Sequence, residues 1–265
     1  MTFCTLSSGS SGNSAFLSYN DTNILIDCGR SGKHICSRLN DLGVSPDCID
    51  GILVTHEHSD HISGLGVFSR KYNVPVYATE GTWQGIFDCK SVGKFAENNI
   101  KTIAPYKSFE IGNIKIVPFE IPHDANQPVG YRFLAGTTII ASATDIGYLS
   151  ESVVQGVAGA NVVLLESNHD IDMVKRSTKY SPQLKNRILS NVGHLCNNYA
   201  AAFASYLAKN GTEHIILGHL SDENNEPEIA YNTAANAMAK KGIDCKKDVF
   251  LTIARRHELS EVVRI

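Results

Sequence analysis

The segment THEHSDH, residues 55–61, decides how this sequence is interpreted. It overlaps the end of GILVT, residues 51–55, a short apolar run that predicts a buried strand. Imidazole and carboxylate groups are ligands for divalent metals, and a sheet holds groups at the ends of its strands in fixed positions. We therefore predict a metal site at this strand end, with a polar loop carrying surface histidines as the alternative.

Strands and helices are mixed along the whole chain on both sides of this segment. An early hairpin is predicted over residues 14–19 and 23–27, with its turn at Asn20 and Asp21. Apolar runs predict further strands at 75–79, 137–145, 161–167, 213–219 and 249–253, and the helical pattern predicts helices at 62–72, 80–90, 197–209 and 227–241. No linker rich in Pro or Ser separates the two halves, so we expect one layered α/β domain over residues 1–265.

Composition limits the class of protein. The 265 residues carry 24 Lys plus Arg and 27 Asp plus Glu, and this net charge of −3 does not indicate a general polyanion binder. No apolar run is long enough to span a bilayer, and the first residues lack a secretory signal pattern. The seven cysteines are scattered without a CxxC pair, so no disulfide framework is indicated. We expect a cytoplasmic protein with no membrane association and no obligate protein partner.

THEHSDH resembles the HxHxDH signature of the metallo-β-lactamase superfamily. Further motifs of that family stand in the family's order, with LIDCG (25–29) before it and IPHD (121–124), ATDIG (143–147) and ILGHLS (216–221) after it. The resemblance spans about residues 2–255 and implies a four-layer αββα sandwich in a single domain without an inserted nuclease domain. It implies these roles: His56, His58 and His123 hold one metal, Asp60, His61 and His219 hold a second, Asp145 bridges both, and Asp27 orients a ligand histidine or its loop.

The chemistry of such a site is hydrolysis. Two adjacent divalent ions can generate hydroxide at neutral pH and stabilise the oxyanion of an attacked phosphorus or carbonyl. We expect two ions per chain, either Zn²⁺ or Mn²⁺, with Fe²⁺ also compatible with the donors. Water is then the nucleophile, and Asp60 contributes to catalysis as a ligand of the second ion. Cys28 and Cys196 lie near these motifs and are expected to be packing residues.

The loop SSGSSGNS, residues 7–14, bears on substrate binding. It runs directly into the predicted hairpin, so we expect a tight loop whose backbone N–H groups approach an anionic group, with Ser10, Ser11 and Asn13 as contacts. A flexible linker is the alternative.

Glu166 in ESNHD and His194 in GHLCN match a glutamate and a histidine that form a proton-donating pair in the tRNA-processing RNase Z branch of the superfamily. The match is partial, because Leu165 and Cys196 replace a histidine and a threonine of that branch. An imidazole held by a carboxylate is suited to protonating the leaving oxygen of a phosphodiester. We therefore predict His194 as general acid and Glu166 as its partner, with helix capping or surface pairing as the alternative; His169 is a further candidate for phosphate contact.

The stretch KRSTKYSPQLKNR, residues 175–187, has five basic residues and no acidic ones. It predicts a contact strip for a phosphate backbone through Lys175, Arg176 and Lys179, with a solvated charged face as the alternative. Only 74 residues separate Asp145 from His219, which leaves no room for a large inserted domain.

These motifs together resemble the bacterial YycJ/WalJ group, small members of the superfamily. That resemblance implies a metal-dependent DNase, a 5′ to 3′ exonuclease, with DNA favoured over RNA. Two alternatives stay open: a small-molecule hydrolase such as a cyclic phosphodiesterase or thioesterase, and a regulatory protein linked to cell-wall signalling.

Overall fold

The structure, a computed structural model, describes all residues from 1 to 265. The chain divides into two compact units, each described by itself below. Unit 1 comprises Met1–Glu120, Ala125–Thr137 and Arg255–Ile265, and unit 2 comprises Ile121–Asp124 and Thr138–Ala254. The single domain over residues 1–265 stays a prediction. No helix combines the length and the apolar character that crossing a membrane requires.

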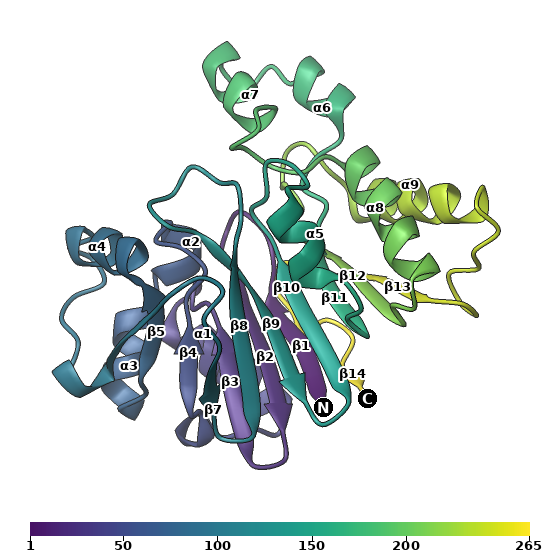
Figure 1. Cartoon of the computed structure of the whole chain (residues 1–265). Helices are drawn as coiled ribbons and strands as arrows, with labels where there is room; N and C mark the ends of the chain where they lie inside the picture. The colour runs from purple at the N-terminus through teal and green to yellow at the C-terminus, as the bar shows by residue number, and fades with distance from the viewer. The chain divides into compact units, whose positions relative to one another are not determined.

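Unit 1 contains a seven-stranded sheet in the order β14-β1-β2-β3-β4-β5-β6 (Figure 1). Strands β1 to β3 and β14 pair antiparallel, and β3 to β6 pair parallel. The predicted hairpin is confirmed, because Tyr19 pairs with Thr22 across a two-residue turn. The strand bounds are β1 Thr2–Ser7, β2 Ser14–Tyr19, β3 Thr22–Ile26, β4 Gly51–Leu53, β5 Val76–Thr79, β6 Ile100–Ile103 and β14 Val263–Arg264.

The helices of unit 1 are short, and two of them begin at a capping side chain. Ser31 caps α1 and Thr79 caps α4 through their side chains. The helix predicted at 62–72 is confirmed from Leu65 to Tyr72, but its start differs, because Ile62 ends the preceding helix α2. Gly64 lies between the two helices, and an added Cβ there would lie 1.9 Å from the Arg30 carbonyl oxygen. The bounds are α1 Gly32–Asp41, α2 Ser59–Ile62, α3 Leu65–Tyr72 and α4 Glu80–Asp88, with 3₁₀ turns η1 Pro46–Cys48 and η2 Glu97–Asn99.

Unit 1 also contains the antiparallel strands β7 Phe109–Ile111, β8 Ile114–Glu120 and β9 Val129–Ala135. Gly112 forms their first turn with a φ of 51°, a left-handed conformation that favours glycine. The core of the unit packs the helices against the parallel strands with fully buried side chains, among them Leu25, Leu39, Ile52 and Phe68.

Unit 2 contains four parallel strands with helices between them (Figure 1). Helix α5 packs on β10, α8 on β11, and α9 on both α8 and β13. Because the strands are parallel, their carboxyl ends lie at one edge, where Asp145, Glu166 and His219 occur. The bounds are β10 Thr138–Ala143, β11 Val162–Glu166, β12 His214–Gly218, β13 Phe250–Ile253, α5 Glu151–Val157, α6 Ile171–Arg176, α7 Pro182–Ile188, α8 Asn197–Lys209 and α9 Pro227–Ala239.

Candidate metal centre and active site

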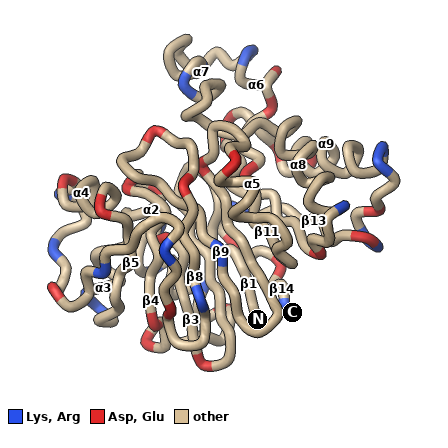
Figure 2. Tube along the Cα trace, viewed as in Figure 1, with Lys and Arg blue, Asp and Glu red and all other residues tan.

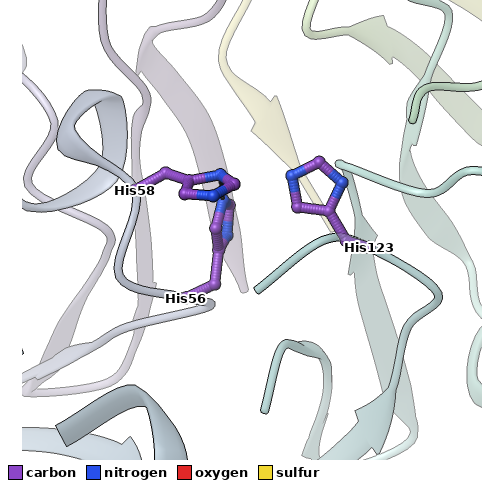
Figure 3. Close-up of side chains that lie close together, drawn as sticks. All are labelled: His56, His58 and His123. Carbon is purple, nitrogen blue, oxygen red and sulfur yellow. Dashed lines mark hydrogen bonds between the residues drawn. The ribbon is translucent and has the colours of Figure 1, made fainter. Parts of the chain in front are cut away.

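In unit 1, the THEHSDH segment connects β4 to α2 and brings two imidazoles together. The Nε2 atom of His56 lies 3.1 Å from the Nδ1 atom of His58, and the two rings are nearly perpendicular, at 81°. Figure 3 shows these two rings pointing toward one another, and it also labels His123 of unit 2. Two nitrogens bound to one zinc ion lie about 3.4 Å apart if the site is tetrahedral, so this pair fits two ligands of one ion.

Asp27 holds the remaining part of the segment in place. At the end of β3, its Oδ1 accepts a hydrogen bond from the Thr55 backbone N–H at 2.8 Å. Its Oδ2 accepts from the Thr55 hydroxyl and from His61 Nδ1, both at 2.8 Å. A hydrogen bond at Nδ1 fixes the tautomer of His61 and leaves Nε2 as its ligand atom. Asp27 thus contacts an expected ligand histidine, and its role at a metal site stays a prediction. Thr55 is a supporting residue that the sequence analysis missed.

The loop at residues 7–14 is ordered by contacts with this segment. The Asn13 backbone N–H donates to the Asp60 carbonyl oxygen at 2.7 Å, and the Asn13 amide donates to Asp60 Oδ2 at 3.2 Å. The same amide lies 3.1 Å from His61 Nε2, whereas Ser10 and Ser11 are exposed. Asn13 therefore contacts expected metal ligands, and only the two serines present their side chains to solvent.

In unit 2, the strand ends gather a second set of donors. Asp145, Glu166, His194 and His219 each offer one ligand atom within 4.8 Å of the others. Asp145 Oδ1 lies 3.3 Å from His219 Nδ1 and 3.8 Å from His123 Nε2. Mixed imidazole and carboxylate donors of this kind suit Zn²⁺, Mn²⁺ and Fe²⁺.

His123 comes from the short segment of unit 2 that precedes Asp124. Its Nδ1 lies 3.1 Å from the Gly193 carbonyl oxygen, to which it can donate, so its Nε2 is the atom available to a metal. Burial lowers the pKa of His123, which favours the neutral imidazole that metals bind.

Glu166 is the centre of the hydrogen-bond network of unit 2. Its side chain is fully buried, and its Oε1 accepts from His194 Nδ1 at 2.9 Å and from His219 Nδ1 at 2.8 Å. Its Oε2 accepts from the backbone N–H groups of Ile146 at 2.7 Å and Leu195 at 3.0 Å. Burial acts to raise the pKa of Glu166, but the two imidazoles outweigh it and lower that pKa to about 2. The carboxylate is therefore ionised and holds both histidines.

His169 lies close to this network but is enclosed. It is 1% exposed, and its Nδ1 lies 3.3 Å from the Asn168 side-chain oxygen. Burial lowers the pKa of His169 to about 4, so its ring is neutral at pH 7. A neutral imidazole offers phosphate a hydrogen bond without a charge, which weakens the interpretation of His169 as a phosphate contact.

The basic stretch 175–187 forms parts of α6 and α7, and acidic residues offset its charge (Figure 2). Lys179 forms an ion pair with Glu223, and Arg187 with Asp124. Lys185 donates to the Lys175 carbonyl oxygen at 2.9 Å. The strip is less positive than its sequence indicates, because the neutralising residues come from distant parts of the chain.

Comparisons with known proteins define the class. The β-lactamase superfamily domain family matches residues 22–220. The crystal structure of Zn²⁺-bound PqqB from Methylobacterium extorquens is 18% identical and matches with a TM-score of 0.71, covering 98% of this chain and 100% of that chain. The chain belongs to the β-lactamase superfamily. Its fold is the predicted αββα metallo-β-lactamase sandwich, and it is a metal-dependent hydrolase.

Within that superfamily, the chain is similar to two proteins over most of its length. Exodeoxyribonuclease WalJ of Streptococcus pneumoniae is 42% identical over 245 residues, covering 91% of each chain. Exodeoxyribonuclease YycJ of Bacillus anthracis is 39% identical over 240 residues, covering 91% of this chain and 90% of the other. The resemblance to the YycJ/WalJ group is confirmed.

Proposed function

We propose that this protein is a metal-dependent nuclease, a DNA exonuclease acting 5′ to 3′. The choice of DNA rests on the two exodeoxyribonuclease relatives that match nine tenths of the chain. One observation supports hydrolysis of a phosphodiester. The imidazole of His194 is hydrogen-bonded through Nδ1 to the buried, ionised carboxylate of Glu166, and both side chains lie beside groups that can bind a metal.

The donors fit the two ions that the family resemblance implies. The ligands of the first would be His56, His58 and His123; those of the second would be Asp60, His61 and His219; and Asp145 would bridge. Zn²⁺ or Mn²⁺ suits this set, and Fe²⁺ is compatible. When bound, such ions act as Lewis acids that activate water and offset the negative charge of the transition state.

His194 is proposed as the general acid. Glu166 accepts its Nδ1–H, so the opposite nitrogen, Nε2, is the atom that carries the transferable proton. The ionised carboxylate stabilises the protonated ring before the transfer and fixes its orientation. The side chain of His194 is 20% exposed, whereas Glu166 is fully buried, so only the histidine of this pair can reach a substrate.

One assay tests the proposal. Metal-free protein is resupplied with Mn²⁺ or Zn²⁺ and incubated with single- and double-stranded DNA and RNA labelled at either the 5′ or the 3′ end. We expect metal-dependent release of short products, starting at the 5′ end and faster for DNA. Release of products from the 3′ end would contradict the proposed 5′ to 3′ direction. Cleavage at internal positions would show that the protein is an endonuclease.

A second candidate is a small-molecule phosphodiesterase, because the ion pairs of Lys179 and Arg187 reduce the charge available to a long polyanion. Hydrolysis of a cyclic nucleotide without cleavage of any polynucleotide would favour it.

All seven cysteines are free, which supports the proposed cytoplasmic location.

A further inference from the structure

Unit 2 has a pocket next to the Glu166–His194 pair that no sequence motif predicted. Its volume is about 420 Å³, within the range of about 300–1,000 Å³ typical of small-molecule sites. Its lining includes Gly147, Tyr148, His169, Asn191, His194 and Tyr199, and the other lining residues are apolar or Cys196.

The walls of this pocket are fixed by the catalytic network. Glu166 Oε2 accepts from the N–H group of Leu195, which lines the pocket, and from that of Ile146, the residue before the lining residue Gly147. At Gly147 the two lining segments are in close contact, since an added Cβ would lie 2.2 Å from the Asn191 carbonyl oxygen. The pocket is therefore formed before any ligand binds, which reduces the entropy that binding costs.

The lining favours a neutral ligand group. No Lys, Arg, Asp or Glu lines the pocket, so apart from His194 at its edge toward the proposed cleavage site it offers a phosphate no opposite charge. His169 is neutral at pH 7, because burial lowers its pKa to about 4. Tyr148 and Tyr199 are 46% and 66% exposed, so both rings are available for contact with a ligand. Apolar side chains, exposed rings and one amide, Asn191, suit a neutral planar heterocycle.

We propose that this pocket binds an unpaired nucleobase, that of the nucleotide whose oxygen leaves when the phosphodiester is cleaved. The proposal rests on the proposed function and specifies its substrate subsite. His194, the proton donor, lines the pocket, so the nucleotide that receives the proton is the one beside it. Stacking on tyrosine rings discriminates little between bases, because every base has an aromatic face.

Binding of a base in this pocket has two consequences for the substrate. A base in the pocket cannot remain paired, so the enzyme should act on single strands or on frayed ends. The base of the leaving nucleotide should also strengthen the binding of DNA, whichever of the four bases it is. An abasic nucleotide at the same position keeps the sugar and the phosphate but removes the stacking surface.

The test uses the metal-loaded protein and Tyr199→Ala. A matched control is Tyr206→Ala, because Tyr206 lies on the same helix, is 48% exposed and does not line the pocket. Substrates are single-stranded DNA with an abasic nucleotide on one side or the other of the scissile bond. Binding of dAMP and of deoxyribose 5-phosphate is measured by calorimetry in parallel.

We expect Tyr199→Ala to raise KM on normal DNA about 5- to 100-fold, the range for loss of one stacked base, and Tyr206→Ala to have no such effect. One abasic placement should raise KM similarly and should add nothing in Tyr199→Ala. Tyr199→Phe, which keeps the ring, should restore most of the affinity. The wild type should bind dAMP more tightly than deoxyribose 5-phosphate, and Tyr199→Ala should lose this difference.

If the active enzyme has equal KM values for abasic and normal DNA, the pocket does not bind a base. The proposal that the protein is a nuclease would then still hold. A protein that binds dAMP through Tyr199 but cleaves no polynucleotide would support the pocket and overturn the nuclease proposal. Additive effects of the abasic nucleotide and Tyr199→Ala would also contradict the pocket, because the two changes would then act at different places.

Discussion

Replacing Glu166 with glutamine should lower the stability of the protein or its affinity for metal, in addition to impairing His194 as general acid. The motif alone suggests that Glu166 only orients His194, so that its loss would be mild. In the structure, however, Oε1 accepts hydrogen bonds from both His194 and His219, and Oε2 accepts hydrogen bonds from two backbone N–H groups. All four partners are donors, and an amide can replace the carboxylate at only one of its two ends.

The size of the effect follows from the two orientations of the amide. With its oxygen toward the histidines, its NH₂ group faces the N–H groups of Ile146 and Leu195, and each unsatisfied buried donor costs about 1–3 kcal/mol. With its NH₂ group toward the histidines, His219 must accept at Nδ1 and carry its proton on Nε2, the expected metal-binding atom. We therefore expect about 2–6 kcal/mol lower stability, or metal affinity about 10- to 100-fold lower.

The assay compares Glu166→Gln with His194→Ala. Bound metal is measured by elemental analysis after dialysis against graded chelator, unfolding is followed in denaturant, and hydrolysis is measured on DNA and on a p-nitrophenyl phosphodiester. His194→Ala should keep its metal and lose about 10²- to 10⁴-fold in rate on DNA. It should lose far less on the activated ester, whose leaving group needs no proton. Glu166→Gln should lose activity on both substrates.

Two results would refute this reasoning. If Glu166→Gln retains full metal and wild-type stability, the contact with His219 has no energetic role, and Glu166 serves His194 alone. If His194→Ala loses equally on DNA and on the activated ester, His194 binds or positions the phosphate and is not the acid.

Three further outcomes are expected. His58→Ala should lose bound metal by elemental analysis, and full occupancy would remove His58 from the ligand set. Replacing Lys175 and Arg176 with Ala should flatten the salt dependence of KM on single-stranded DNA by roughly 1.4 log units per log unit of salt if both contact phosphates; Lys240→Ala is the control, and an unchanged slope would make the strip a solvated face. For His169, with a folded pKa of about 4 against an ordinary 6.5, the unfolded chain binds the proton first on acidification. Stability should therefore fall between pH 6.5 and 4 by about 3 kcal/mol more in wild type than in His169→Gln, and parallel denaturation curves would contradict this.

The sequence was informative where local rules and sheet geometry agree. Apolar runs followed by Asp145, Glu166 and His219 predicted three strand ends, and parallel pairing necessarily brings such ends to one edge. The pairing of Glu166 with His194 also followed from a motif, although the two residues are 28 positions apart. In each case the chemistry depends on a strand end, which periodicity locates well.

The sequence failed where the answer depends on a distant partner. Nothing near Lys179 shows that Glu223 neutralises it, and nothing near Asn13 shows that its amide contacts Asp60 and His61. The pocket beside His194 could not be found either, because its walls come from several segments and its tyrosines belong to no motif. Such features are set by tertiary contacts, which a single sequence does not contain.

Backbone strain occurs at three strand ends that carry expected site residues. Asp27, Asp145 and His219 have φ values of 60°, 58° and 56°, in the left-handed region that costs most residues about 1–2 kcal/mol. Propensity would place glycine or asparagine at these positions, but neither supplies a carboxylate or an imidazole. For Asp27, three hydrogen bonds to Thr55 and His61 offset the strain. Local preference is thus violated at three expected site residues, although not only there, since Tyr106 also has a φ of 63°. At Asp27, the folded contacts keep the strained conformation in place.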